Sequence, residues 1–202
     1  GDMVYYEGGH ASFMKLEAKG NDELSVKPLI TDEYNRIGLP GGDSPKLRVD
    51  KSITGFRTAS PIYHDGLLYT LGNFGMLAVV DTTKTTKQDA IVYTTFPDFD
   101  FRNGYSRKST GFGIGASPAL AGKYIYMIDS GNCMIVMEPG RVYKPIAKNS
   151  IVETVPAQQP NAFGAHPYWS GPHQEQTEAS PIFEGSRIYI RGEQFLYCIG
   201  EK

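Results

Sequence analysis

The chain has 202 residues, of which 40% are hydrophobic and 21% are charged, as in an ordinary globular protein. Its formal net charge of -2 gives no basic field to attract a nucleic acid, and no apolar run reaches the length of a membrane span. The 23 glycines, 13 prolines and 13 tyrosines predict many short strands joined by turns.

A repeated pattern runs along the chain. The tripeptide Ala-Ser-Pro begins at Ala59, Ala116 and Ala179, and each time a tyrosine follows ten residues later and an acid 12 residues after that. These residues are Tyr69, Tyr126 and Tyr189 with Asp81, Glu138 and Glu201. Tyr5 and Glu17 have the same spacing, so the repeat has four copies, and the first lacks the Ala-Ser-Pro strand.

In chain order, the second copy predicts strands at 59–63, 67–71, 76–80 and 90–96. The third copy predicts strands at 124–128 and 134–137, and the fourth at 187–190 and 195–199. The middle strands are apolar on both faces, which suits sheets stacked on one another. The sequence therefore predicts an all-β fold, a β-propeller of about four antiparallel four-stranded blades, of which the first and last are incomplete.

The predicted domain is a single partial propeller spanning 1–202. Its blades cover approximately 1–30, 59–96, 116–155 and 179–202, and inserted loops cover 31–58, 97–115 and 156–178. Incomplete blades leave unpaired edges and apolar faces. The simplest explanation is that further blades belong to a longer parent chain, and the less favoured one is that two copies form one ring.

The segment from Gly66 through Tyr69, Gly75 and Asp81 to Lys84 resembles the repeat of the pyrroloquinoline-quinone-type, or quinoprotein-like, propellers. The resemblance covers essentially the whole chain and implies the fold rather than an activity. The chain departs from the family pattern, because the Thr-Gly after the acid and the docking tryptophan are absent.

The resemblance raises the question of a pyrroloquinoline quinone and calcium site. Family dehydrogenases use adjacent cysteines, a calcium site and an aspartate base. Here Cys133 and Cys198 stand far apart, and no carboxylates match the calcium ligands. We therefore expect no cofactor, no resident metal and no assigned catalytic residue, although the quinone and calcium stay open through the resemblance.

The inserted loops hold the candidate ligand-binding residues. All three insertions precede an inner strand, so they should share one face of the propeller with the turns between second and third strands. The candidates are Arg102, Tyr105 and Arg107 in the second insertion, and His166, Tyr168, Trp169, His173 and Glu175 in the third. Aromatic rings beside charged groups suit a glycan or a peptide, and the alternative is that the rings only fasten long loops to the blades.

Other residues favour structural roles. His166, His173 and Glu175 match no strong metal-binding signature. An acid repeated in every copy has a repeated task, which we expect to be accepting N–H groups of a turn. Both cysteines are expected to be buried thiols without a disulfide.

These patterns favour a non-catalytic propeller that binds a protein or carbohydrate partner on its loop-rich face. The alternative is a divergent quinone-dependent oxidoreductase or a sugar-active enzyme with catalytic residues in missing blades; a pure scaffold is a third candidate. Because relatives of this type are usually exported bacterial proteins, a periplasmic or extracellular location is favoured.

Overall fold

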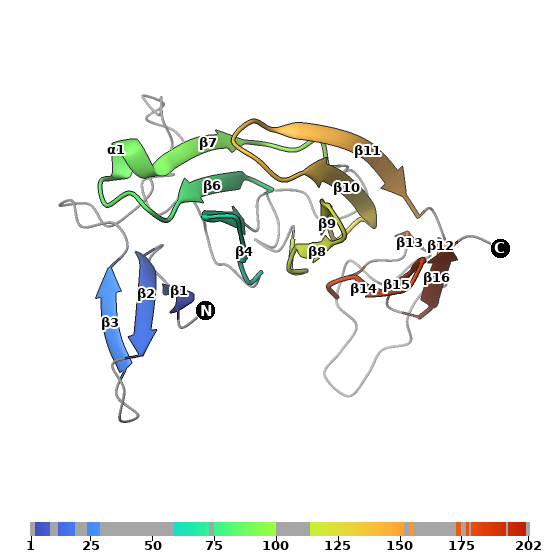
Figure 1. The fold of residues 1–202 in the computed structure, drawn as a ribbon. Coiled ribbons are helices and arrows are strands. Elements are labelled where there is room, and N and C mark those ends of the chain that lie inside the picture. The colour runs from blue at the N-terminus through green and yellow to red at the C-terminus, as the bar shows by residue number, and fades with distance from the viewer. Residues whose placement is uncertain are drawn as a thin grey trace.

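The computed structural model describes residues 3–8, 12–18, 24–28, 59–72, 75–99, 114–151, 154–155, 173–174, 177, 179–192 and 194–200. Strands dominate them, and every strand pair is antiparallel. Four sheets follow one another in chain order, and we call them blades 1 to 4 (Figure 1).

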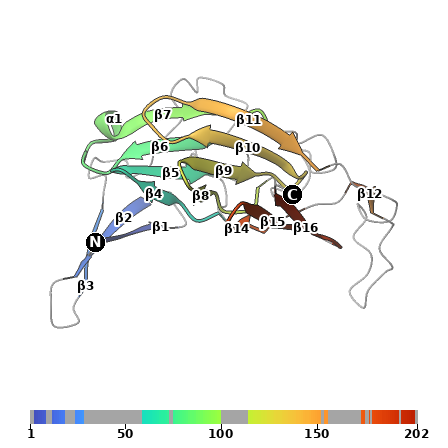
Figure 2. The same cartoon turned by 45° about the vertical axis from the view of Figure 1, so that its right-hand side comes forward.

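Blades 2 and 3 each have four strands, and Figure 2 shows them beside one another. Blade 2 consists of β4 (Ile62–His64), β5 (Leu67–Leu71), β6 (Leu77–Asp81) and β7 (Ile91–Thr95). Blade 3 consists of β8 (Ala119–Ala121), β9 (Tyr124–Ile128), β10 (Cys133–Glu138) and β11 (Lys144–Ser150). Each inner strand begins directly after the proline of Ala-Ser-Pro, where the missing N–H costs no ladder bond.

The blades at the two ends have three strands each. Blade 1 consists of β1 (Met3–Gly8), β2 (Ser12–Ala18) and β3 (Leu24–Pro28). Blade 4 consists of β14 (Ile182–Glu184), β15 (Arg187–Arg191) and β16 (Leu196–Gly200). The expected all-β fold with incomplete first and last blades is thereby confirmed for the described residues.

The turn between the first and second strands is a two-residue hairpin turn. In blade 2, Asp65 has a φ of 47° and Gly66 a φ of 78°, which is the left-handed backbone that such turns require. Gly122 and Gly185 have positive φ at the matching turns of blades 3 and 4. Gly66 is the second residue of its turn, whereas Gly122 and Gly185 are the first of theirs, and at each of these positions glycine avoids the strain that a Cβ brings at positive φ.

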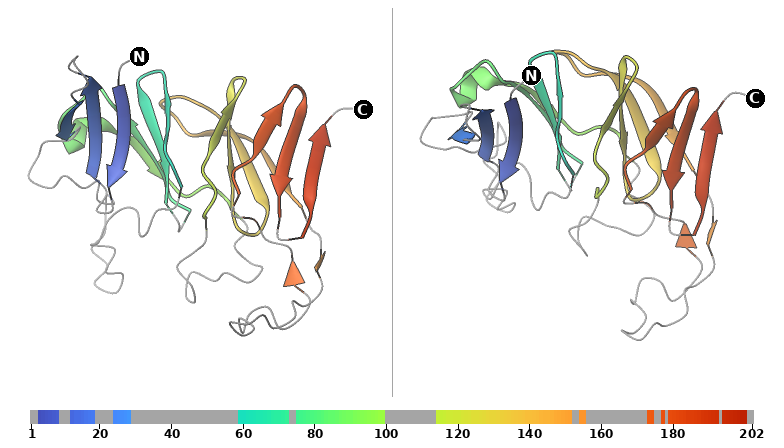
Figure 3. Two further views of the ribbon diagram at one scale, coloured as in Figure 1. Left: turned by 90° about the horizontal axis from the view of Figure 1, so that it is seen from below. Right: turned by 60° about the horizontal axis from the view of Figure 1, so that its bottom comes forward.

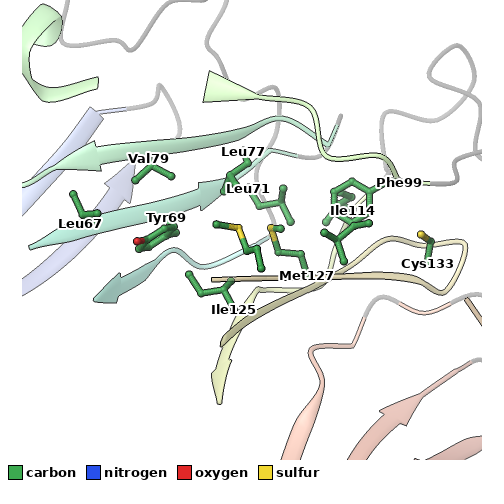
Figure 4. Close-up of a cluster of buried hydrophobic side chains, with 12 residues drawn as sticks. Leu67, Tyr69, Leu71, Leu77, Val79, Phe99, Ile114, Ile125, Met127 and Cys133 are labelled. Atoms are coloured by element: carbon green, nitrogen blue, oxygen red, sulfur yellow. The ribbon is translucent and has the colours of Figure 1, made fainter. Parts of the chain in front are cut away.

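The main hydrophobic core lies between blades 2 and 3. Every residue of β5 and β6 is buried, as expected for strands covered on both faces. Leu67, Leu71 and Val79 of blade 2 pack in one cluster with Ile125 and Met127 of blade 3 (Figure 4). A second cluster joins blades 3 and 4, so the core is a series of blade-to-blade contacts.

Three details differ from the sequence expectations. A one-turn helix, α1 (Lys87–Ala90), precedes β7 where a turn and the start of a strand were expected. Cys133 is buried as expected, but Cys198 is exposed, because it lies in blade 4 and the described chain places no fifth blade over it. Both cysteines are free.

The third difference concerns the repeated acid. Asp81 stands opposite Leu67, but in blade 4 Gly200 rather than Glu201 stands opposite Arg187. The cause is the turn between the second and third strands, which is one residue shorter in blade 4 than in blade 2. Gly200, 11 residues after Tyr189, therefore holds the register position that Asp81 holds 12 residues after Tyr69.

Candidate functional site

The inserted loops leave and re-enter the blades at one face, which we call the loop face. In blade 2, β5 ends, β6 begins and β7 ends at this face, because successive strands run antiparallel. The inner strand β8 of the next blade starts there as well. Each blade-to-blade connection therefore shares the face with the turns between second and third strands, as the repeat predicts.

The second insertion is fastened at both ends to the core between blades 2 and 3. Phe99 is 8% exposed and Ile114 is fully buried, and both belong to the main hydrophobic cluster. Figure 4 shows their side chains next to one another. Beside Phe99, the carboxylate of Asp98 pairs with the Lys148 ammonium of β11 at 2.9 Å. The two described ends of this insertion therefore lie against a packed core.

The third insertion follows β12 (Thr154–Val155), and a short strand within it, β13 (His173–Gln174), pairs with β12. Val155 stands opposite His173 in this pair. Figure 3 shows the pair beyond the ends of the blade 4 strands. The pairing brings the ends of the intervening 17 residues together, as in the second insertion.

Thr177 ties the end of the third insertion to two blades. Its N–H donates to the carbonyl of Ser130 in blade 3 at 3.2 Å, and its hydroxyl donates to the carbonyl of Arg191 in blade 4. The same hydroxyl oxygen accepts the Ala179 N–H at 3.2 Å. Thr177 is 3% exposed, so these bonds are shielded from water.

A buried polar turn in blade 3 provides the surface on which Thr177 is held. The Asp129 carboxylate accepts the Cys133 N–H at 2.8 Å, and the Asn132 N–H donates to the Asp129 carbonyl at 3.1 Å. Asn132 has a φ of 59°, which asparagine tolerates better than most residues. The strands predicted at 124–128 and 134–137 place a turn here, and Asp-Ser-Gly-Asn is a turn signature, but the buried hydrogen bonds of this turn were not predicted.

The candidate binding residues are placed only in part. His173 lies in β13, opposite Val155. The others, Arg102, Tyr105, Arg107, His166, Tyr168, Trp169 and Glu175, lie outside the described residues. The structure therefore describes how the ends of the second and third insertions are held, and the roles of the binding residues stay predictions.

On the opposite face, the repeated acid has a structural task. In blade 2, Asp81 accepts both the N–H of Thr83, at 2.9 Å, and its hydroxyl, at 2.6 Å. The Arg141 guanidinium of blade 3 donates to the other carboxylate oxygen. In blade 3, Glu138 instead pairs with Lys144 on the neighbouring strand at 2.6 Å. The expectation of turn N–H bonding is thus confirmed for Asp81 and differs for Glu138.

These contacts lower the pKa of Asp81. The hydroxyl of Thr83, then Arg141, then the N–H of Thr83 all favour the ionised carboxylate, and the pKa falls to about 2. Nearby, burial raises the pKa of Tyr69 and of Tyr93. Asp81 is therefore an ionised carboxylate that joins its own turn to Arg141 of blade 3.

A series of serine hydrogen bonds joins the inner strands near the axis. The Ser60 N–H donates to the Ser117 hydroxyl oxygen at 2.7 Å, and the Ser117 N–H donates to the Ser180 hydroxyl oxygen at 2.9 Å. The three serines are those of Ala-Ser-Pro, so blade 3 accepts a bond from blade 2 and blade 4 accepts one from blade 3. The repeat recurs in the sequence because this contact recurs in space.

The described residues contain no group of three or more His, Cys, Asp or Glu side chains placed to hold a metal ion. No helix among them has the length and apolar character needed to cross a membrane.

The chain was compared with known proteins. No family model matches it, and no curated protein matches it either. Among solved structures, BamB from Moraxella catarrhalis superposes with a TM-score of 0.54 at 10% identity, over 99% of this chain and 43% of BamB. The quinohemoprotein alcohol dehydrogenase ADHIIG from Pseudomonas putida superposes with a TM-score of 0.57 at 12% identity, over 95% of this chain and 27% of the enzyme.

The chain thus spans less than half the length of either structure. At these identities the likeness shows the fold and carries no activity across. Together with the antiparallel four-stranded sheets, it shows that the chain has a β-propeller fold.

Proposed function

We propose that the chain is a non-catalytic, quinoprotein-like propeller that binds a protein or a glycan on its loop face. The observation that supports this proposal is the anchoring of the loops. Phe99 and Ile114 hold one loop in the core, and β12, β13 and Thr177 hold the other. Loops carried by a rigid scaffold are where binding residues of such folds concentrate.

The proposed contact residues differ in task. Tyr105, Tyr168 and Trp169 offer flat apolar faces for sugar rings or peptide side chains. Arg102 and Arg107 donate hydrogen bonds to carboxylates and hydroxyls of the ligand. Further hydrogen-bond donors and acceptors for the ligand come from His166, His173 and Glu175. Because the relatives of the resembled family are mostly exported, the proposed location is periplasmic or extracellular.

The chain has a single tryptophan, Trp169, so its intrinsic fluorescence reports on the proposed site. We expect a saturable change in Trp169 emission when oligosaccharides or peptides are titrated in. Arg102→Ala or His166→Ala should weaken binding about tenfold, which corresponds to about 1.4 kcal/mol. Lys84→Ala on the opposite face is the matched control and should bind as the wild type does. Equal affinity in all variants would contradict the proposal.

The second candidate is a quinone-dependent oxidoreductase, which the superposition on a quinohemoprotein alcohol dehydrogenase favours. Among the described residues, no carboxylate cluster fits the calcium that accompanies the quinone. Titration with pyrroloquinoline quinone and calcium, followed by absorbance after gel filtration, separates the two candidates. Retention of the quinone would favour the enzyme, and its complete loss favours the binding platform.

A further inference from the structure

Two of the described strands belong to none of the four blades. β12 and β13 form a two-stranded sheet of their own, with Thr154 opposite Gln174 and Val155 opposite His173. An antiparallel pair this short is marginal in water, because two residue pairs do not offset the entropy lost when their backbones are ordered. The pair contains the candidate binding residue His173, so the placement of that residue depends on what holds the two strands.

One buried turn of blade 3 holds both strands of this pair. The Ile151 N–H donates to the Asn132 carbonyl at 3.2 Å, and the Thr177 N–H donates to the Ser130 carbonyl at 3.2 Å. Ile151 stands three residues before β12, and Thr177 stands three residues after β13. Three Cα steps of about 3.8 Å span at most about 11 Å, so both strands are kept close to this turn.

Thr177 is polar at a repeat position that is apolar in the preceding insertion. Ile114 and Thr177 each stand two residues before the alanine of Ala-Ser-Pro, and Ile114 is fully buried in the core between blades 2 and 3. The repeat therefore places a buried residue here but does not require a hydroxyl. The Thr177 hydroxyl donates to the Arg191 carbonyl of blade 4 and accepts the Ala179 N–H. Because Thr177 is 3% exposed, bonds to water do not readily replace these two bonds.

We propose that Thr177 is a positioning residue: its hydroxyl fixes β13, and with it the backbone of His173, to the junction of blades 3 and 4. The inference rests on the proposed function only because that function gives His173 a binding task. Release of Thr177 frees β13, and the short pair then opens while the blades stay folded. Thr177, Ala179 and β13 therefore form one unit that opens at a smaller free-energy cost than the blades.

The first test is amide hydrogen exchange of the wild-type chain, followed by NMR at increasing urea and without any ligand. The amides of Thr177 and Ala179 and the hydrogen-bonded amides of β13 should share one protection factor with little dependence on urea. Amides of β5 and β6 should be more strongly protected and should depend steeply on urea, because they exchange when the blades unfold. A β13 that exchanges without protection while Thr177 stays protected would overturn the proposal.

The second test compares variants at the two equivalent repeat positions. Thr177→Val keeps the branched shape and removes the hydroxyl, so the amides of β13 and Ala179 should exchange about tenfold faster. Thr177→Ser keeps the hydroxyl and should restore protection close to that of the wild type. Ile114→Val is the matched control: it should speed exchange in β5 and β6, because it removes a methyl group from their core, and leave β13 at the wild-type rate.

Unchanged protection of β13 in Thr177→Val would also overturn the proposal. So would an equal loss of β13 protection in Ile114→Val, because β13 would then open only together with the blades. The wild-type measurement decides the matter even if Thr177→Val does not fold. Exchange is measured without a ligand, so a failure of ligand binding, read from Trp169 emission, would contradict the proposed function and leave this attachment intact.

Discussion

Asp81 connects two blades through one carboxylate whose side chain is 3% exposed. One oxygen closes the turn through Thr83, and the other accepts from Arg141 of the next blade. A buried carboxylate that accepts from neutral donors on one oxygen and from a guanidinium on the other favours its ionised form. The contact between blades 2 and 3 should therefore weaken in acid.

We predict that Asp81→Asn lowers the free energy of unfolding by about 1–2 kcal/mol at neutral pH, because an ionic acceptor is lost. The folded pKa, about 2, lies below the usual 3.8, so the stabilisation is complete above the usual value and is lost as the pH falls towards 2. The difference between variant and wild type should shrink over that range. Urea unfolding at a series of pH values measures it.

Asp65→Asn is the control for this experiment, since the Asp65 side chain is 87% exposed. Asparagine tolerates the same positive φ, so this variant should unfold like the wild type. A constant gap between Asp81→Asn and the wild type from neutral pH to acid would show that the carboxylate charge is not what stabilises the contact.

At the scale of strands and sheets, the serine bonds define how blades follow one another. The N–H groups of Ser60 and Ser117 each donate to the serine hydroxyl of the next blade. The proline that follows each serine has no N–H and cannot compete for that acceptor. The tripeptide therefore combines a strand start with a blade-to-blade bond.

We predict that Ser117→Ala removes the acceptor of Ser60 and speeds hydrogen exchange at the Ser60 amide. A loss of about 1 kcal/mol corresponds to roughly a fivefold faster rate. The Ser117 amide should keep its protection, because its acceptor is Ser180. Amide exchange followed by NMR distinguishes the two sites.

Ser117→Thr retains the hydroxyl and should restore protection of the Ser60 amide. An unchanged Ser60 rate in Ser117→Ala would show that the bond does not persist in solution.

At the scale of the whole molecule, the core between blades 2 and 3 also carries the second insertion. Phe99 and Ile114 come from its two ends and pack in the same cluster as β5, β6, β9 and β10. Stability and the placement of the loop are thereby linked. A change at the base of the loop should be felt throughout both blades.

We predict that Phe99→Ala lowers the free energy of unfolding by about 3 kcal/mol, because it leaves a cavity in this core. Phe96→Ala is the control, since Phe96 is 49% exposed three residues earlier, and it should cost less than about 1 kcal/mol. Thermal and urea unfolding give both values. Equal losses in the two variants would mean that Phe99 does not anchor the loop.

Much of the fold could be predicted from the sequence. The spacing of Ala-Ser-Pro, tyrosine and acid predicted the blades, since strand lengths and turns follow from local residue types. The apolar character of 67–71 and 76–80 predicted strands covered on both sides. Of the candidate site, the sequence predicted the loop face but not its anchors, because Phe99 and Thr177 act through residues distant in the chain.

Periodicity in the sequence alone determined the architecture: a motif that recurs must fold into the same local unit each time, and short-range sterics decide that unit. Only the tertiary structure decided which apolar face is covered. Cys133 and Cys198 both lie in third strands, yet one is buried and the other exposed, because burial depends on whether a neighbouring blade stands against the strand. The residues around each cysteine do not specify whether a neighbouring blade covers it.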